Sequence, residues 1–90
     1  MIRENIRVVN STGLHARPAA TFVKTLKKYE SSVTLVNNGK ETAIKGLMSV
    51  LGAGVKGKSC IEIICEGPDE QALMDEIKGL FANGFGEKEE

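Results

Sequence analysis

The sequence predicts a small two-layer α/β sandwich in which helices cover one face of a β-sheet. Three observations indicate this fold class. Short segments with strand periodicity alternate with helical ones in the order β-α-β-β-α-β-α, 90 residues are enough for only one modest core, and no repeat or composition break suggests a second domain. We therefore expect a single domain over residues 1–90, with residues 85–90 as a frayed acidic tail.

Four segments have the alternation of apolar and polar residues that is typical of half-buried strands. In the last of them, Ile61, Ile63 and Cys65 share one face. Between the second and third, Asn37-Asn38-Gly39 is a strong signal for a tight hairpin. The expected strands are residues 2–9, 32–36, 40–44 and 59–65.

Three segments have apolar residues at helical spacing, so each is expected to bury one stripe. The second is short, from Leu47 to Leu51, and follows Gly46. The third opens after Gly67 with Pro68 in its first turn, and Gly84 is placed to end it. The apolar stripe of the first, which begins at Ala16, is Ala19, Phe22, Val23, Leu26 and Tyr29, and that of the third is Leu73, Ile77, Leu80 and Phe81.

The formal net charge of zero hides an asymmetry along the chain. Residues 1–59 contain ten Lys or Arg and three Asp or Glu, for +7, whereas residues 60–90 contain two and nine, for −7. A generic binder of polyanions would be basic throughout, so we expect no nucleic-acid binding. The chain also lacks a secretory signal and any apolar run near the roughly 20 residues of a membrane span. We expect a cytoplasmic protein without membrane insertion.

The two cysteines do not suggest a disulfide or a metal site. Cys60 and Cys65 are an odd number of residues apart in one strand, which places them on opposite faces. Their spacing matches no metal motif, and the chain has one histidine to add to them. We expect packing or surface roles for both, and neither a metal nor a cofactor.

The residues that carry chemistry meet where the first loop joins the first helix. His15 lies there, and the backbone N–H groups of Ala16 and Arg17 have no intrahelical acceptors, so this helix end favours an anion. Arg17 can form fork-like hydrogen bonds to phosphoryl oxygens, and a neutral imidazole can attack phosphorus. A histidine near a helix start can also be only a capping or surface residue. If His15 reacts, the lack of a second acid or base in the motif favours a carrier over a hydrolase.

The segment Gly-Leu-His-Ala-Arg-Pro-Ala at 13–19 resembles the active-site signature of HPr, the histidine-phosphorylatable phosphocarrier of the bacterial phosphotransferase system. The similarity covers roughly residues 2–85 and includes Asn38-Gly39-Lys40, residues 45–51, Gly57 and Glu66-Gly67. The resemblance implies an α+β fold, the HPr-like open-faced sandwich, with a four-stranded antiparallel sheet covered on one face by three helices.

The resemblance also implies a function in sugar uptake. His15 would accept a phosphoryl group on Nδ1 from enzyme I, which phosphoenolpyruvate charges, and pass it to a histidine of a IIA-type protein. Arg17 and the backbone of Ala16 and Arg17 would stabilise the group. Such a protein is expected to be monomeric, to need no cofactor, and to act with partner proteins rather than as a stand-alone enzyme.

The resemblance further implies a docking face around the histidine. The apolar residues in it could belong to the core, but a short helix buries only one side, and Val50 lies opposite Met48. An exposed apolar patch would exclude water during transfer, and methionine adapts to several partners. The lysines, which include Lys28, can be a solvated helix face or can steer acidic partners. The implied docking residues are Ala16, Ala20, Lys24, Lys27, Leu47, Met48 and Leu51.

The chain departs from the family pattern at one regulatory position. Many HPr proteins have a kinase-regulated serine where this chain has Gly46, so we expect no regulatory phosphoserine there, and the role does not transfer to Ser49. Residues 80–85 resemble NPr, the nitrogen-related branch, whereas residues 19–24 favour general HPr. An NPr-type carrier in a regulatory phosphorelay and a regulatory HPr-like binding module are the alternatives, although His15 and Arg17 argue against the latter. An RNA-binding module would need paired strand aromatics that the sequence lacks.

Overall fold

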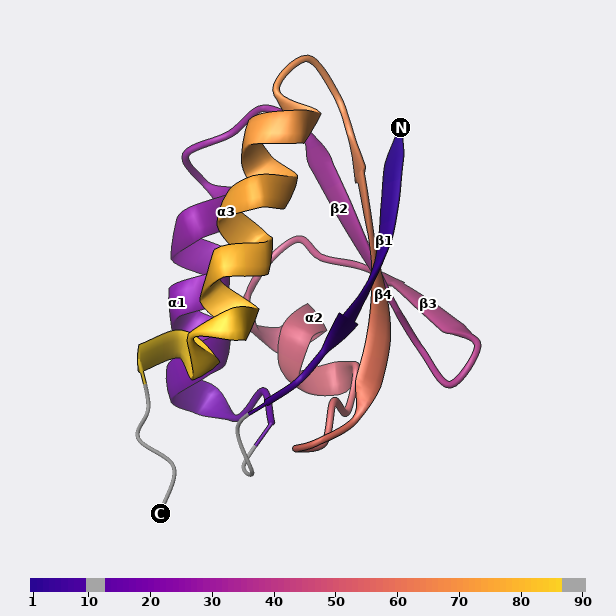
Figure 1. The fold of residues 1–90 in the computed structure, drawn as a ribbon, viewed down its shortest axis with the longest axis vertical. Helices are drawn as coiled ribbons and strands as arrows, with labels where there is room; N and C mark the ends of the chain where they lie inside the picture. Colours follow the sequence, from indigo (N-terminus) through magenta and orange to yellow (C-terminus); the bar gives the residue numbers. More distant parts are fainter. Residues whose placement is uncertain (10–12, 87–90) are drawn as a thin grey trace.

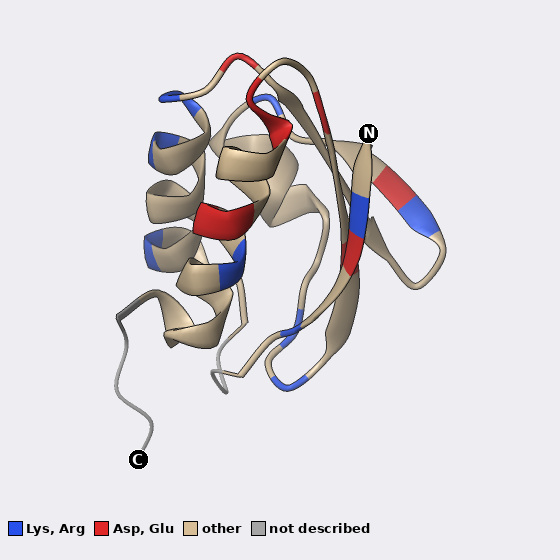
Figure 2. Cartoon of the chain, turned by 45° about the horizontal axis from the view of Figure 1, so that its top comes forward, with Lys and Arg blue, Asp and Glu red and all other residues tan. Residues whose placement is uncertain are grey.

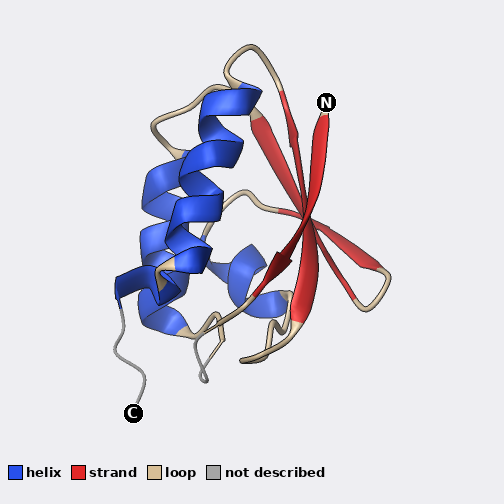
Figure 3. Cartoon of the chain, in the orientation of Figure 1, coloured by secondary structure: helices blue, strands red, loops and turns tan. Residues whose placement is uncertain are grey.

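A computed structural model describes residues 1–9 and 13–86 and confirms the predicted fold class and element order. Figures 1 and 3 show one sheet with all three helices on the same face, while the other face stays open. A short 3-10 turn follows the last helix. The elements are β1 (Ile2–Arg7), α1 (Ala16–Leu26), β2 (Ser32–Asn37), β3 (Lys40–Ala43), α2 (Leu47–Gly52), β4 (Cys60–Glu66), α3 (Glu70–Ala82) and η1 (Gly84–Gly86).

The sheet is antiparallel throughout, with the strand order β1-β4-β2-β3. The last strand of the sequence, β4, therefore lies inside the sheet between β1 and β2. Ile63 of β4 is opposite Leu35 of β2, and both are fully buried. Cys65 is buried on the helix side, where desolvation raises the pKa of its thiol to about 11, and Cys60 is exposed. The two cysteines are unbridged and on opposite faces, as the spacing predicts.

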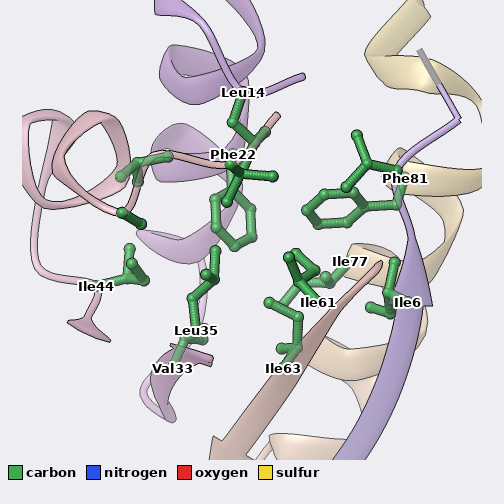
Figure 4. Close-up of a cluster of buried hydrophobic side chains, with 14 of the residues drawn as sticks. Ile6, Leu14, Phe22, Val33, Leu35, Ile44, Ile61, Ile63, Ile77 and Phe81 are labelled. Carbon is green, nitrogen blue, oxygen red and sulfur yellow. The ribbon is translucent and has the colours of Figure 1, made fainter. Parts of the chain in front are cut away.

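The core lies between the sheet and the helices, where aliphatic residues of β2 and β4 meet aromatic rings (Figure 4). Phe22 of α1 packs edge-on against Phe81 of α3, with 5.7 Å between ring centroids, and Phe85 lies 4.8 Å from Phe81. Phe85 is thus part of the packed structure. The expectation of a frayed tail from residue 85 is wrong at that residue, because its ring completes this cluster. Residues 87–90 lie outside the described part of the chain.

Helix α3 differs from the prediction at both its stripe and its start. Met74 is buried and Leu80 only half-buried, because Leu73, Met74, Ile77 and Phe81 form the inward stripe. The helix begins at Glu70, so Pro68 lies in the preceding turn rather than in the first helical turn. Gly84 follows the end of the helix with φ +60, as predicted for a residue that ends it.

Ion pairs join the basic and acidic parts of the chain. Arg3 on β1 pairs with Glu62 on β4 at 3.3 Å, and Lys28 after α1 pairs with Glu76 on α3 at 2.5 Å. Figure 2 shows basic positions along α1 and acidic positions on the neighbouring α3 and in the loops at the top of the view. These ion pairs join basic residues of the first part of the chain to acidic residues of the second, so part of the charge asymmetry is neutralised by contacts in the folded protein. No helix in the described residues is both long and apolar enough to cross a membrane.

Candidate functional site

His15 is the N-cap residue of α1. Its backbone is extended, with φ −84° and ψ −171°, and its carbonyl oxygen accepts the first helical hydrogen bond from the N–H of Ala19 at 2.9 Å. The His15 side chain is exposed, and the first turn of α1 contains no acidic residue. The backbone N–H groups of Ala16 and Arg17 therefore lie at the N-terminal end of α1, immediately after His15 in the chain. This end of a helix attracts negative charge.

The loop before His15 is held against the segment that follows α2. Gly13 is buried with φ +66°, and a Cβ atom there would lie 2.5 Å from the carbonyl oxygen of Val55 and 2.7 Å from the nitrogen of Gly57. The N–H of Leu14 donates to the same Val55 oxygen at 3.2 Å. Leu14 is buried beside Phe22, as Figure 4 shows, so the next residue in the chain faces solvent. Gly13 and Leu14 are thus both held inside, and His15 is the first exposed residue after them.

Arg17 lies in the first turn of α1 and is exposed. Its carbonyl oxygen accepts a hydrogen bond from Thr21 Oγ at 3.3 Å, and within residues 1–9 and 13–86 its guanidinium forms no ion pair. An anion at this helix end would therefore meet two kinds of donor: backbone N–H groups and a guanidinium that presents a planar fork. Such an arrangement can hold the oxygens of a phosphoryl group.

The α1 residues implied in docking share one face of that helix. Ala16, Ala20, Lys24 and Lys27 follow one another at intervals of three or four residues, and all four are exposed. At a helical rise of 1.5 Å per residue, this face extends about 18 Å from His15 to Lys27. The structure confirms that these side chains are accessible; their part in docking stays a prediction.

Helix α2 presents an exposed apolar patch, which consists of Leu47, Met48 and Leu51. Their exposed fractions are 40%, 78% and 36%, whereas Val50 on the opposite side is fully buried. Lys27 of α1 and Gly46 before α2 line the same shallow hollow of about 150 Å³, so the α1 face and the start of α2 are neighbours. The predicted division of α2 into a buried and an exposed side is confirmed.

The three lysines at and after the C-terminal end of α1 are not equivalent. Lys28 pairs with Glu76, which also accepts a hydrogen bond from the hydroxyl of Tyr29, and these two contacts lower the pKa of the Glu76 carboxyl. Within the described part of the chain, Lys24 and Lys27 form no ion pair. Lys24 and Lys27 are therefore the two lysines whose charge is available to attract an acidic partner. The difference from Lys28 depends on Glu76 of α3, so the helical spacing of the lysines could not reveal it.

Ser49 stabilises the start of α2. Gly46 is the N-cap residue and has no side chain to cap with, but Ser49 Oγ accepts hydrogen bonds from the N–H groups of Lys45 at 3.0 Å and Gly46 at 3.1 Å. The same hydroxyl donates to the Gly46 carbonyl at 2.6 Å. In a capping box, the side chain at the third helical position accepts a hydrogen bond from the backbone N–H of the N-cap residue. Ser49 has this role here, at a position where Glu or Gln is usual. Sequence reasoning missed this role, and it gives Ser49 a structural reason to be present.

Sequence reasoning also missed Asn37, whose side chain donates to the backbone after α2 at Ala53 and Gly54. The sequence predicts only a hairpin turn at this position. That prediction concerns the backbone torsion angles and does not reveal the contacts of the Asn37 side chain.

The part of the chain that the structure describes also offers no evident metal site. Among the described residues, no three His, Cys, Asp or Glu side chains lie close enough together to hold a metal ion.

Comparison with known proteins gives a consistent result. The family model described as "PTS HPr component phosphorylation site" matches residues 2–83. The phosphocarrier protein HPr of Treponema pallidum is 36% identical over 88 residues, which cover 98% of this chain and all of that protein. The multiphosphoryl transfer protein of Vibrio cholerae is 38% identical over 84 residues, which cover 90% of this chain and 21% of that longer protein.

Solved structures agree with the sequence matches. The crystal structure of HPr from Thermoanaerobacter tengcongensis superimposes with a TM-score of 0.92 at 34% identity, over 98% of this chain and 99% of that one. A second crystal structure from the same organism, described as an HPr dimer, matches with a TM-score of 0.75 at 34% identity, over 97% of this chain and all of that one.

Proposed function

The chain belongs to the HPr family of phosphotransferase-system phosphocarriers, and on that premise we propose that it carries its phosphoryl group on His15. The observation that carries this proposal is the place of the histidine. His15 is exposed at the N-cap of an 11-residue helix whose first turn contains Arg17 and no carboxylate. This is the arrangement that can both receive and hold a phosphoryl group.

The proposed chemistry is a displacement at phosphorus. The unprotonated ring nitrogen of His15, by family resemblance Nδ1, attacks the phosphorus held by enzyme I. A nitrogen–phosphorus bond forms as the bond to the donor breaks, and the donor keeps that bond's electron pair. The N–H groups of Ala16 and Arg17 and the Arg17 guanidinium stabilise the charge on the transferring oxygens. In a second displacement, a histidine nitrogen of a IIA-type protein attacks this phosphorus. A new nitrogen–phosphorus bond forms as the bond to His15 breaks, and the His15 nitrogen keeps that bond's electron pair.

We place partner docking on the exposed face beside His15. The apolar patch of α2 would exclude water at the point of transfer, while Lys24 and Lys27 attract acidic partner surfaces. Hydrolysis is avoided because the acceptor, rather than a water molecule, occupies the space next to phosphorus. The protein acts only within these complexes. The unbridged cysteines accord with action in the cytoplasm, whose reducing conditions keep thiols free; fractionation of cells checks this location.

We propose that the protein is a monomer in solution, because both partners need the face formed by α1 and α2. Three related structures are described as dimers, so the oligomeric state requires its own measurement. Sedimentation equilibrium should give a mass near 9.7 kDa across the concentration range used for transfer assays. A mass of twice that value would contradict a monomeric carrier.

Sugar uptake is the branch we favour, because the HPr relatives match over nearly the whole chain. Transfer rates measured with purified sugar-type and nitrogen-type enzyme I and IIA proteins check this choice. Faster transfer within the nitrogen-type set would assign the chain to the other branch.

The decisive test is phosphotransfer from phosphoenolpyruvate labelled with ³²P. With enzyme I, the wild-type protein should become labelled and the label should be lost in acid, as expected for a phosphoramidate. His15→Ala should acquire no label above background, because the chain has no other histidine. A thermal unfolding curve of His15→Ala serves as the folding control. Label on that folded variant, or an unlabelled wild type with several enzyme I proteins, would refute the proposal.

A further inference from the structure

The C-terminal end of α2 is held by a side chain from another element. Nδ2 of Asn37, the last residue of β2, lies 3.0 Å from the carbonyl oxygen of Ala53 and 3.3 Å from that of Gly54. Carbonyl groups at a helix end have no donors within the helix, so the Asn37 amide supplies them. The six residues of α2 are too few for a stable isolated helix, and contacts of this kind decide where it lies.

The hairpin holds Asn37 in place. Asn37 is paired with Lys40 across the turn, and the two turn residues Asn38 and Gly39 have φ +55° and +80°. Two positive φ angles are typical of the type I′ turn, whose twist matches that of the strands it joins. Asn37 is also half-buried, so its amide is presented to α2 from a well-defined strand end.

The segment that Asn37 contacts also holds the loop of His15. We call residues 53–57 the connecting segment. The N–H of Leu14 donates to Val55 within it, and Gly13 packs against its backbone at Val55 and Gly57. Ala53 and Val55 are buried, which fixes the segment against the core. The connecting segment thus touches Asn37 on one side and the residues immediately before His15 on the other.

We propose that Asn37 is a positioning residue for phosphotransfer. It holds the apolar patch of α2 in a fixed place relative to His15, because both depend on the connecting segment. This inference rests on the proposed role of His15 and adds to it the residue that aligns docking with chemistry. Asn37 is not itself a catalytic residue, since its amide is bonded to the backbone after α2.

Substitution of Asn37 by aspartate gives the sharpest test. Asn37→Asp has the same shape but no N–H to donate, so two carbonyl oxygens would face a carboxylate. We expect the KM of enzyme I for this protein to rise at least about fivefold, because loss of even one of the two hydrogen bonds typically changes an equilibrium by about that factor. The kcat should change less than about twofold, because the groups around His15 remain. Asn37→Gln keeps the donors and should recover part of the loss.

Asn38→Asp is the matched control. It makes the same chemical change one residue along the same turn, at an exposed position with φ +55° where aspartate is well tolerated. It therefore adds the same negative charge without removing the bonds to Ala53 and Gly54. Equal KM values for the two aspartate variants would overturn the proposal.

Amide hydrogen exchange supplies a measurement that needs no phosphate. Loss of the Asn37 bonds should speed exchange at Ala53 and Gly54, whose N–H groups bond within α2, and at Leu14, whose N–H bonds to Val55. Unchanged exchange at all three sites in folded Asn37→Asp would overturn the proposal. Because this measurement is independent of labelling, failure of the Asn37 contact can be distinguished from failure of the proposed role of His15.

Discussion

At the scale of single residues, the position of His15 depends on what comes immediately before it. Gly13 approaches the connecting segment more closely than any residue with a side chain could, and Leu14 enters the core. Neither residue has chemistry to offer. Together they turn His15 outward at the point where α1 begins, so a buried glycine and a buried leucine decide where the imidazole is presented.

Substitution of Gly13 by alanine tests this close approach. Gly13→Ala should lower the free energy of unfolding by about 2–3 kcal/mol, since it adds a clash to the strain of a positive φ. Gly54→Ala is the control: Gly54 has the same φ of +66°, but a Cβ atom there meets nothing within 4 Å. Urea unfolding of both variants gives the difference. Equal free energies of unfolding for Gly13→Ala and Gly54→Ala would show that the loop before His15 can move to accommodate the added Cβ atom.

At the scale of elements, α1 combines two functions in one helix. Its first turn presents N–H groups that favour an anion, and Lys24 and Lys27 are exposed on the face that we propose for partner docking. Its opposite face buries Phe22 and holds the helix to the core. The neighbouring α2 adds the apolar patch but lacks the length to hold itself, which is why Ser49 and Asn37 bond to its two ends.

Reversal of the charge on α1 should slow association with partners. Lys24→Glu with Lys27→Glu should reduce the rate of transfer from enzyme I about tenfold at low ionic strength, and salt should shrink the difference. Arg7→Glu with Lys40→Glu is the control, because both residues are exposed and the change in net charge is the same. Stopped-flow transfer measured at several salt concentrations checks this. Equal slowing by both pairs would show an effect of net charge alone.

At the scale of the whole molecule, one carboxylate links the loop after α1 to the start of α3. Asp69 accepts hydrogen bonds from the N–H groups of Glu30 and Ser31, both at 2.9 Å, and from the Ser31 hydroxyl. These bonds lower the pKa of Asp69, the Ser31 hydroxyl most strongly. Glu76, bound by Lys28 and Tyr29, joins the same two helices further along.

Acid should therefore weaken the fold at this junction. A carboxyl group whose pKa is lower in the folded than in the unfolded protein stabilises the fold above its unfolded pKa, and this contribution is lost as pH falls through the folded value. The ordinary pKa values of the Asp69 and Glu76 side chains are 3.8 and 4.5, so the urea midpoint should fall below about pH 4.5. Asp69→Asn should show a smaller fall. If the urea midpoints of Asp69→Asn and the wild-type protein changed identically with pH, the proposed stabilising role of the Asp69 carboxylate would be contradicted.

Much of this protein is determined by local sequence. Apolar periodicity determined seven elements in their order, because each helix or strand must bury one face and the period of that face is local. The exposure of the α2 patch was predictable for the same reason, since a six-residue helix with Val50 inside must turn Met48 outward. Residues 13–19 likewise placed the histidine at a helix start.

The tertiary structure decided what depends on contacts between distant residues. Whether Lys28 is paired depends on Glu76, 48 positions away, and the end of α2 depends on Asn37, 16 positions from Ala53. The burial of Phe85 likewise depends on Phe22 and Phe81. No local period encodes such contacts, because they arise only when the elements pack. The sequence by itself thus determined which residue could carry a phosphoryl group, whereas packing decided how that residue and the exposed apolar patch of α2 are held in place.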